Sequence, residues 1–285
     1  PREWERDFTA MRELGIDTVI LIRAGYRNRA TFDSEVLNAE REMLPAYGDL
    51  VELFLDQAER CGMDFYFGTY DAGTFWDEGD YHTEVDINKD FCAEAAERYA
   101  SHEAFAGWYI SHEIDAYDEA QMGVYEELAD HLRDLYAGPI LMSPYIHGAK
   151  QFGSEAFSLE EHVDHWEHVF DRIEGHVDIV AFQDGNVPLH ELPRYLQANR
   201  ELADAHGLTS WSNVETFDRD VRIQFPPIDF RKLRHKMESA VDAGVDKLIT
   251  FEFSHFLSPH ADHPAARALN RRYREWIGSP ENNAE

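Results

Sequence analysis

Helical patterns and short apolar runs alternate along this chain, and the junction between them recurs. At four junctions an amphipathic helical pattern ends in Gly, one or two residues follow, and an apolar run begins. Gly readily adopts the left-handed conformation that closes a helix and turns the chain back. The apolar runs after these junctions span residues 18–22, 65–68, 209–211 and 247–251. The recurrence predicts repeated units of a helix followed by a strand.

Three further apolar runs fit between these units, at residues 105–110, 139–143 and 177–183. Each follows a helical pattern and precedes a polar loop. Strands that alternate with helices predict a parallel sheet joined by right-handed crossovers. The runs are apolar on both faces, so we expect helices on one side and a barrel core on the other. The predicted fold is α/β, a (β/α)8 TIM barrel.

Only seven of the eight strands are visible in the sequence. The chain opens inside a helical pattern, with apolar residues at helical spacing from Trp4 to Leu14 and without a leader-like segment. We therefore expect the first strand to lie upstream of residue 1. A doubly wound open sheet is the alternative, but no Gly-rich phosphate loop follows any strand. Residues 1–278 are predicted to form one domain and 279–285 a polar tail.

Charge changes the expected partners rather than the fold. The chain carries 26 Lys and Arg against 56 Asp and Glu, a net charge of −30. This field opposes binding to nucleic acid or an anionic membrane surface, and no apolar run reaches the roughly 18 residues of a membrane span. An acidic, Lys-poor chain with 13% aromatic residues is typical of folded proteins in molar salt, where charges are screened within about 3 Å. We expect a high-salt organism, with no preference between a cytoplasmic and a secreted location.

The ends of the predicted strands carry polar and aromatic side chains. Active sites of (β/α)8 barrels lie at the carboxyl ends of their strands. Five of the seven ends carry an acidic residue, and Glu113 and Glu215 each directly follow a run that is otherwise apolar or neutral. The other candidates at or beside these ends are Arg23, Tyr70, Asp71, Trp76, Tyr109, His112, Tyr145, Gln183, Asp184, Asn213, Glu252 and His255.

Carboxylates among aromatic platforms suit carbohydrate chemistry. Glycosidic cleavage needs one carboxylic acid to protonate the leaving oxygen and one carboxylate to attack the sugar or to activate water. We predict Glu113 and Glu215 as this catalytic pair and the other twelve residues as substrate-binding groups, with no cofactor and no metal. The competing interpretation is structural, because 56 acidic residues also reach strand ends by chance.

The segments that carry these residues resemble a known family. Residues 107–115, 178–185, 211–217 and 251–259, with the first helix at 4–15, are similar to a glycosidase-like TIM-barrel family catalogued as domain of unknown function 4434, here in a haloarchaeal-like form. The resemblance implies a fold related to the large retaining clan of glycosidases. In that clan the acid/base follows strand four and the nucleophile follows strand seven.

With the missing strand counted as the first, Glu113 falls on strand four and Glu215 on strand seven. His112 departs from the clan, which commonly has Asn before its acid, and this leaves recognition of the sugar 2-hydroxyl open. The hypothesis is double displacement, which requires the two carboxyl groups to lie about 5–5.5 Å apart, against roughly 6.5–9.5 Å for inversion. It also requires a raised pKa for Glu113, from burial or from a neighbouring carboxylate.

Two other functions stay open. The chain has 15 His, which allows a metal-dependent hydrolase or isomerase on the same fold. His162, His165 and His168 recur every three residues on an acidic helix, but no HExxH motif is present and a solvated face is the favoured interpretation. A second cluster, in the last loop, comprises His255, His260 and His263. The remaining alternative is a barrel that binds carbohydrate without turnover, since fold alone does not decide function.

Overall fold

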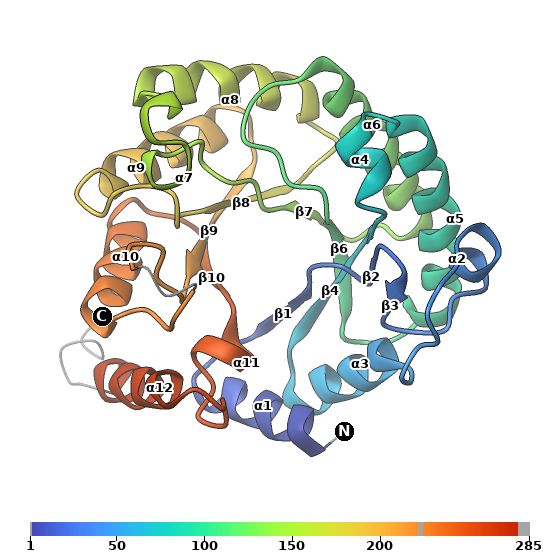
Figure 1. The fold of residues 1–285 in the computed structure, drawn as a ribbon, viewed down its shortest axis with the longest axis horizontal. Coiled ribbons are helices and arrows are strands. Elements are labelled where there is room, and N and C mark those ends of the chain that lie inside the picture. The colour runs from blue at the N-terminus through green and yellow to red at the C-terminus, as the bar shows by residue number, and fades with distance from the viewer. Residues whose placement is uncertain (1, 222–224, 279–285) are drawn as a thin grey trace.

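The structure is a computed structural model that describes residues 2–221 and 225–278. Within these residues a seven-stranded parallel sheet curls into a nearly closed barrel ringed by helices (Figure 1). The strands, in their order in the sheet, are β1 (Thr18–Leu21), β4 (Asp64–Gly68), β6 (Phe105–Ile110), β7 (Ile140–Met142), β8 (Ile179–Gln183), β9 (Thr209–Glu215) and β10 (Lys247–Phe251). The predicted TIM barrel with seven visible strands is confirmed. The predicted tail at 279–285 lies outside the described residues.

Helices alternate with these strands and cover the outside of the barrel (Figure 1). Gly62 closes the helix before β4 with a φ of 66°, as the junction pattern predicts. The long helices are α1 (Arg2–Glu13), α3 (Leu50–Cys61), α5 (Tyr81–Tyr99), α6 (Glu119–Leu135), α8 (Leu159–Ile173), α9 (Leu192–Ala205), α10 (Phe230–Asp242) and α12 (Pro264–Ile277). The short helical segments are α2 (Glu35–Glu40), α4 (Thr74–Glu78), α7 (Ala149–Phe152), η1 (Gly153–Glu155) and α11 (Phe253–Phe256). No helix in the described ranges combines the length and apolar character needed to cross a lipid bilayer.

Successive strand residues point to opposite faces, so each strand contributes to two apolar layers. Phe67 and Trp108 are fully buried between the sheet and its helices and meet edge to face, with ring centroids 5.7 Å apart. Tyr66, Tyr109 and Trp211 belong to a separate cluster inside the barrel. These two layers explain why the strand runs are apolar on both faces.

The barrel is open between its two outermost strands, β1 and β10. At the start of this gap the Lys247 ammonium bridges it, donating to Asp17 Oδ1 at 3.0 Å and to Thr18 Oγ1 at 2.7 Å. A cavity of about 790 Å³ lies along the gap, lined by α1, β1 and β10. Arg274 of α12 donates to Glu13 of α1 at 2.8 Å and closes the outer wall, where the two helices lie side by side (Figure 1).

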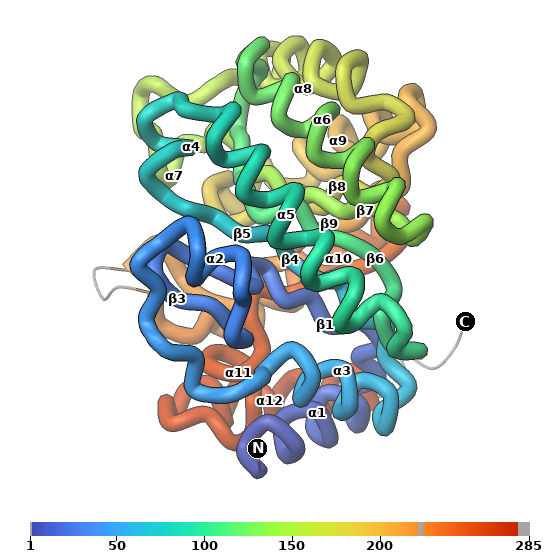
Figure 2. The backbone as a smooth tube through the Cα atoms, turned by 90° about the vertical axis from the view of Figure 1, so that its right-hand side faces the viewer, coloured from blue at the N-terminus to red at the C-terminus, as the bar shows by residue number. Residues whose placement is uncertain are grey.

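A small sheet lies at the end of the barrel where the strands finish. It consists of β2 (Gly25–Tyr26), β3 (Arg29–Ala30) and β5 (Tyr70–Asp71), in the order β3-β2-β5. In Figure 2 this end faces left and also carries α4 and α7. The pairing of β2 with β5 places Tyr26 opposite Asp71 and so fixes one wall of the strand-end region.

We expect Gly68→Ala to destabilise the barrel by about 1–3 kcal/mol, because an added methyl group in a packed core forces the surrounding atoms to shift. A Cβ at Gly68 would lie 2.1 Å from the Leu21 carbonyl oxygen and 2.5 Å from the Ile22 carbonyl carbon, and both are backbone atoms. Gly123→Ala on α6 is the matched control. Its Cβ would meet nothing within 4 Å, and Ala favours a helix over Gly by about 1 kcal/mol. Chemical unfolding should show opposite signs for the two variants, and equal effects would contradict the close strand approach.

Candidate active site

Glu113 and Glu215 stand at the carboxyl ends of strands on different sides of the barrel. Glu215 is the last residue of β9 and is 2% exposed, whereas Glu113 follows β6 by three residues and is half-buried. Both side chains belong to one electrostatic group, since the charge of Glu215 contributes to the pKa of Glu113. The two carboxyl groups therefore lie within electrostatic reach of one another.

The surroundings of Glu113 favour its protonated form. Burial raises the pKa of Glu113, whereas the charge of Arg23 and a hydrogen bond from Gln183 lower it, and the Glu215 and Asp71 carboxylates raise it further. The net direction is upward from the ordinary value. A raised pKa suits a carboxyl group to act as a general acid.

Glu215 is held by a positive charge on its own side of the site. Arg219, four residues later in the loop, donates from Nε to Oε2 at 2.8 Å and from Nη2 to Oε1 at 2.7 Å. Such a fork is the strongest common pairing of a carboxylate with a side chain. On the other side the carboxylate packs on Gly185, where an added Cβ would lie 1.6 Å from Oε2. The position of Glu215 therefore depends on Arg219 and on the absence of a side chain at 185.

A buried ion pair fixes the backbone of Glu215. Lys236 of α10 donates to Asp184 Oδ1 at 2.6 Å and to the Glu215 carbonyl oxygen at 2.9 Å. Asp184 Oδ1 also accepts the Glu215 N–H at 3.0 Å. The side chains of Lys236 and Asp184 are 3% and 1% exposed. Burial raises the pKa of Asp184 and the Lys236 charge opposes that shift, so the pair is structural support beneath Glu215.

Arg23 and Asp71 form the opposite wall. Arg23 Nε donates to Asp71 Oδ2 at 2.8 Å, and Asp71 Oδ1 accepts the Gly73 N–H at 2.8 Å. The neighbouring Tyr70 is fully buried, and its hydroxyl donates to the Arg27 carbonyl oxygen at 2.6 Å. Arg23 thus reaches the site, while Tyr70 serves the wall behind it.

Aromatic side chains line the region beside Glu113. Trp76 of α4 lies against the ring of His112, with ring centroids 4.6 Å apart. His112 is 2% exposed and is turned away from the rim toward Glu84 Oε1, 2.9 Å from its Nε2. Tyr109 points into the barrel interior. Burial raises the pKa of Tyr145 to about 12, and the charges of Asp115 and Glu113 add to the shift, so its hydroxyl stays protonated.

The remaining candidates form two further groups. Gln183 Nε2 donates to the Ser143 carbonyl oxygen, and Asn213 Nδ2 donates to Ser143 Oγ, both at 2.9 Å. Glu252 caps α11 and accepts N–H groups from Ser254 and His255 at 2.9 and 3.0 Å. The exposed His255 ring lies 2.6 Å from the same carboxylate. This last pair lines the cavity at the gap, to one side of the Glu113 and Glu215 group.

Three polar residues of this region were not predicted, although two of them leave a signal in the sequence. Lys236 falls at helical spacing with Leu233, Met237 and Ala240, and all four are buried on α10. Glu84 is likewise in register with buried Asn88 and Phe91 on α5. A charged residue on the apolar face of a helix is a recognisable anomaly. Arg219 lies in a loop without periodicity, so no pattern marks it.

The histidine clusters do not form the metal sites considered from the sequence. His162 is buried and lies 2.7 Å from Asn199 Oδ1, and burial lowers its pKa to about 4. The expectation of a wholly solvated face was therefore wrong for this residue. His260 instead contacts Arg6 at 2.8 Å, and His263 caps α12. Each of these rings is engaged separately.

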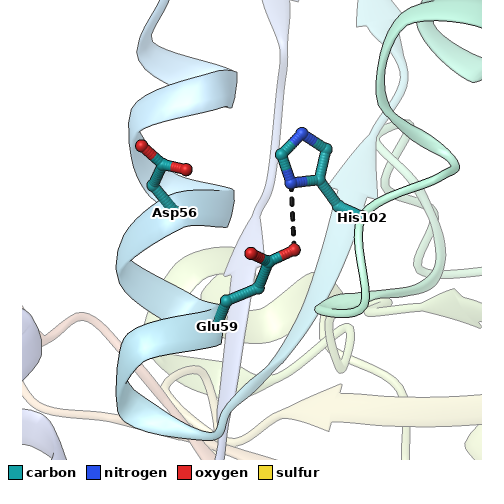
Figure 3. A group of neighbouring side chains, drawn as sticks. All are labelled: Asp56, Glu59 and His102. Carbon is teal, nitrogen blue, oxygen red and sulfur yellow. Dashed lines mark hydrogen bonds and ion pairs between the residues drawn. The ribbon is translucent and has the colours of Figure 1, made fainter.

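Among the residues that the structure describes, two other groups of side chains have the composition of a metal site. The first consists of Asp56, Glu59 and His102 (Figure 3), on α3 and in the loop before β6. It is distant from the strand ends that carry Glu113, because His102 precedes its strand. The second consists of Asp71, Glu84 and His112, all buried, directly behind the site wall.

Comparison with known proteins gives the family and the fold. Residues 1–263 match a family described as "Domain of unknown function (DUF4434)", which confirms the resemblance seen in the motifs. A solved structure from Bacteroides thetaiotaomicron VPI-5482, described as a "putative alpha-L-fucosidase", is 41% identical with a TM-score of 0.93. The match covers 97% of this chain and 88% of that one. No curated protein matches.

More distant structures share the barrel alone. The endo-1,4-beta-D-mannanase of Thermotoga petrophila RKU-1 is 11% identical with a TM-score of 0.61, over 95% of this chain and 94% of that one. The catalytic domain of endoglucanase Cel5A (E5) from Thermobifida fusca is 16% identical with a TM-score of 0.59, over 96% and 86% of the two chains. The fold is therefore a glycoside hydrolase-like TIM barrel.

We expect Lys236→Met to destabilise the protein by about 3–5 kcal/mol, because it leaves the buried Asp184 charge without its partner. Lys232→Met is the matched control on the same helix. Lys232 is 30% exposed and also pairs with two aspartates, Asp218 and Asp220, so its loss should cost at most about 1 kcal/mol. Chemical unfolding of both variants measures the difference. A small effect of Lys236→Met would contradict the supporting role of the buried pair.

Proposed function

Because the chain belongs to the DUF4434 family and is 41% identical to a Bacteroides thetaiotaomicron protein described as a "putative alpha-L-fucosidase", we propose that it is a glycoside hydrolase acting through Glu113 and Glu215. The single observation that carries this proposal is the opposite environment of the two carboxyl groups. Burial raises the pKa of Glu113, whereas Glu215 is held in the Arg219 fork. One group is suited to give a proton and the other to carry a negative charge.

The proposed reaction is a double displacement at the anomeric carbon. Glu113 protonates the glycosidic oxygen, and a Glu215 oxygen attacks the anomeric carbon as the bond to that oxygen breaks. A water molecule then gives its proton to Glu113 and attacks the same carbon, which releases the sugar and regenerates Glu215. This pathway requires a separation of about 5–5.5 Å between the carboxyl groups.

The positively charged groups around the pair have different tasks in this mechanism. Arg219 holds both Glu215 oxygens, and one of these two hydrogen bonds must lengthen as that oxygen forms the bond to carbon. Lys236 holds the Glu215 carbonyl oxygen at 2.9 Å and fixes the direction of the side chain. Arg23 acts on Glu113, because its charge limits how far the pKa of Glu113 rises.

The substrate is proposed to be a glycoside, with α-L-fucosides as the first sugar to test because of the name given to the Bacteroides relative. Trp76 and Tyr145 are the aromatic groups placed to cover apolar sugar faces beside Glu113. Arg23, Gln183 and Asn213 offer polar contacts from the strand ends, whereas Asp71 and Asp184 hold Arg23 and Lys236 in place. Glu252 and His255 would contact a longer substrate near the gap.

One observation favours the second candidate function, carbohydrate binding without turnover. Both oxygens of Glu215 are engaged by Arg219, which leaves neither free for attack in this state. In a barrel that only binds sugars, the Glu215 oxygens could stay paired with Arg219 throughout. Hydrolysis, rather than binding, is therefore the measurement that separates the two functions.

We expect Glu113→Gln and Glu215→Gln each to reduce kcat/KM at least about 100-fold on the best aryl glycoside of a panel assayed in molar KCl. Each variant keeps the size of the side chain but removes the proton donor or the negative charge. Glu127→Gln, a partly exposed change on α6, should leave the rate unchanged. Sugar binding that persists without turnover in the wild type would instead support the non-catalytic barrel.

The alkaline limb of the pH profile should report Glu113. The acid form is active, so kcat/KM falls as pH rises through the raised pKa of Glu113. Gln183→Met removes a hydrogen bond that lowers this pKa and should move the limb to higher pH by roughly 0.5–1 unit, since one unit is 1.36 kcal/mol and a hydrogen bond contributes about that much. Gln197→Met on α9 is the control, and a shift to lower pH in Gln183→Met would refute the assignment.

We also propose that the protein works in concentrated salt. A net charge of −30 destabilises the compact state by self-repulsion, and salt near 1 M screens it within about 3 Å. The melting temperature should rise continuously between about 0.1 and 2 M KCl. A flat or falling melting temperature over that range would rule out adaptation to molar salt.

A further inference from the structure

Asp71, Glu84 and His112 form a compact buried group behind the wall of the site. One donor atom of each lies within 4.8 Å of the others. Asp71 belongs to β5, Glu84 to the first turn of α5, and His112 follows β6. Their exposed fractions are 8%, 0% and 2%. Three elements far apart in the sequence thus deliver two carboxylates and one imidazole to a single enclosed point.

Two of these side chains each have a buried polar atom without a partner. Glu84 Oε2 and His112 Nδ1 are inaccessible to solvent and make no hydrogen bond. Their other polar atoms are occupied, because Glu84 Oε1 accepts the Ala72 N–H at 2.9 Å and lies 2.9 Å from His112 Nε2. An unpaired polar atom in the interior destabilises the folded state, and more so when it is charged. Both atoms therefore call for a partner.

The charge of the Glu84 carboxylate is a second reason to expect a partner at this group. Arg23 pairs with Asp71 at 2.8 Å. Within the described residues the ion pair of Glu84 is with His112, and no Lys or Arg side chain pairs with this carboxylate. A fully buried charge is strongly unfavourable unless it is paired or coordinates a metal. A divalent cation would compensate the Glu84 charge and give Glu84 Oε2 a partner, with His112 binding it through Nε2, the nitrogen that faces Glu84.

The group at Asp56, Glu59 and His102 lacks these features (Figure 3). Both ring nitrogens of His102 already face carboxylates, Glu59 at 3.0 Å and Glu52 at 3.3 Å. Glu59 is exposed, so water can satisfy its oxygens. Similar residue types therefore occur at two places, but of these two groups it is the buried one that has unpaired polar atoms inaccessible to solvent.

We propose that Asp71, Glu84 and His112 bind one divalent first-row transition-metal ion of the Zn²⁺ or Mn²⁺ type. Two carboxylate oxygens and an imidazole nitrogen are common ligands for these ions, and the group has no thiolate. The ion would tie β5 and α5 to the strand end that precedes Glu113. This role is structural and does not rest on the proposed hydrolase activity.

The test is a titration of the chelator-treated full chain with Zn²⁺ and, separately, Mn²⁺. We expect one equivalent to bind and the melting temperature to rise by roughly 5–10 °C at about 100 times Kd. Glu84→Gln should weaken binding at least about tenfold. Glu59→Gln, in the exposed group, should bind as the wild type does.

A crystal of the Zn²⁺-loaded wild type supplies a readout that does not depend on the variants folding. An anomalous diffraction peak among Asp71, Glu84 and His112 is the expected result. No bound metal, a peak at Asp56, or a water molecule between the three side chains would overturn the proposal. Hydrolysis by the wild type and its loss in Glu113→Gln are measured separately, so failure here leaves the proposed function standing.

Discussion

The shared direction of the seven strands is the constraint on which the site depends. Because the strands are parallel, each delivers its last residue to the same end of the barrel. Residues as distant in sequence as Arg23, Glu113 and Glu215 therefore act on one another electrostatically. An antiparallel sheet would send half of them to the opposite end. The loops and helices refine this convergence, but they do not create it.

At this end of the barrel, burial and nearby charges determine the electrostatic surroundings of each carboxyl group. Glu113 has little solvent to stabilise its ionised form, whereas Glu215 has Arg219 against both oxygens and the Lys236–Asp184 pair beneath its backbone. Asp184 has a structural role, because its carboxylate pairs with Lys236. Carboxyl groups at the same end of the barrel thus have different electrostatic surroundings without any difference in residue type.

The repeated junctions, the seven strands and the strand positions of Glu113 and Glu215 could be predicted because each follows from local periodicity or from the order of elements. The orientation of side chains could not. His112 and Tyr70 stand at strand ends in the sequence, yet hydrogen bonds to Glu84 and to the Arg27 carbonyl turn them into the wall. Arg219 could not be predicted as a site residue because a loop has no periodic pattern. Its paired hydrogen bonds with Glu215 form only after folding. Tertiary pairing, rather than pattern, determines which strand-end groups face the substrate.

In the proposed reaction Glu215 attacks the anomeric carbon while Glu113 transfers the proton. The most direct measurement uses a 2-deoxy-2-fluoro glycosyl fluoride of the sugar that the protein hydrolyses, because the fluorine slows release of a covalent glycosyl-enzyme. Mass spectrometry of the digested protein should then find one fluoroglycosyl group on the peptide that carries Glu215. A label on another carboxylate, or an active enzyme that takes no label and inverts the anomeric centre, would contradict the account.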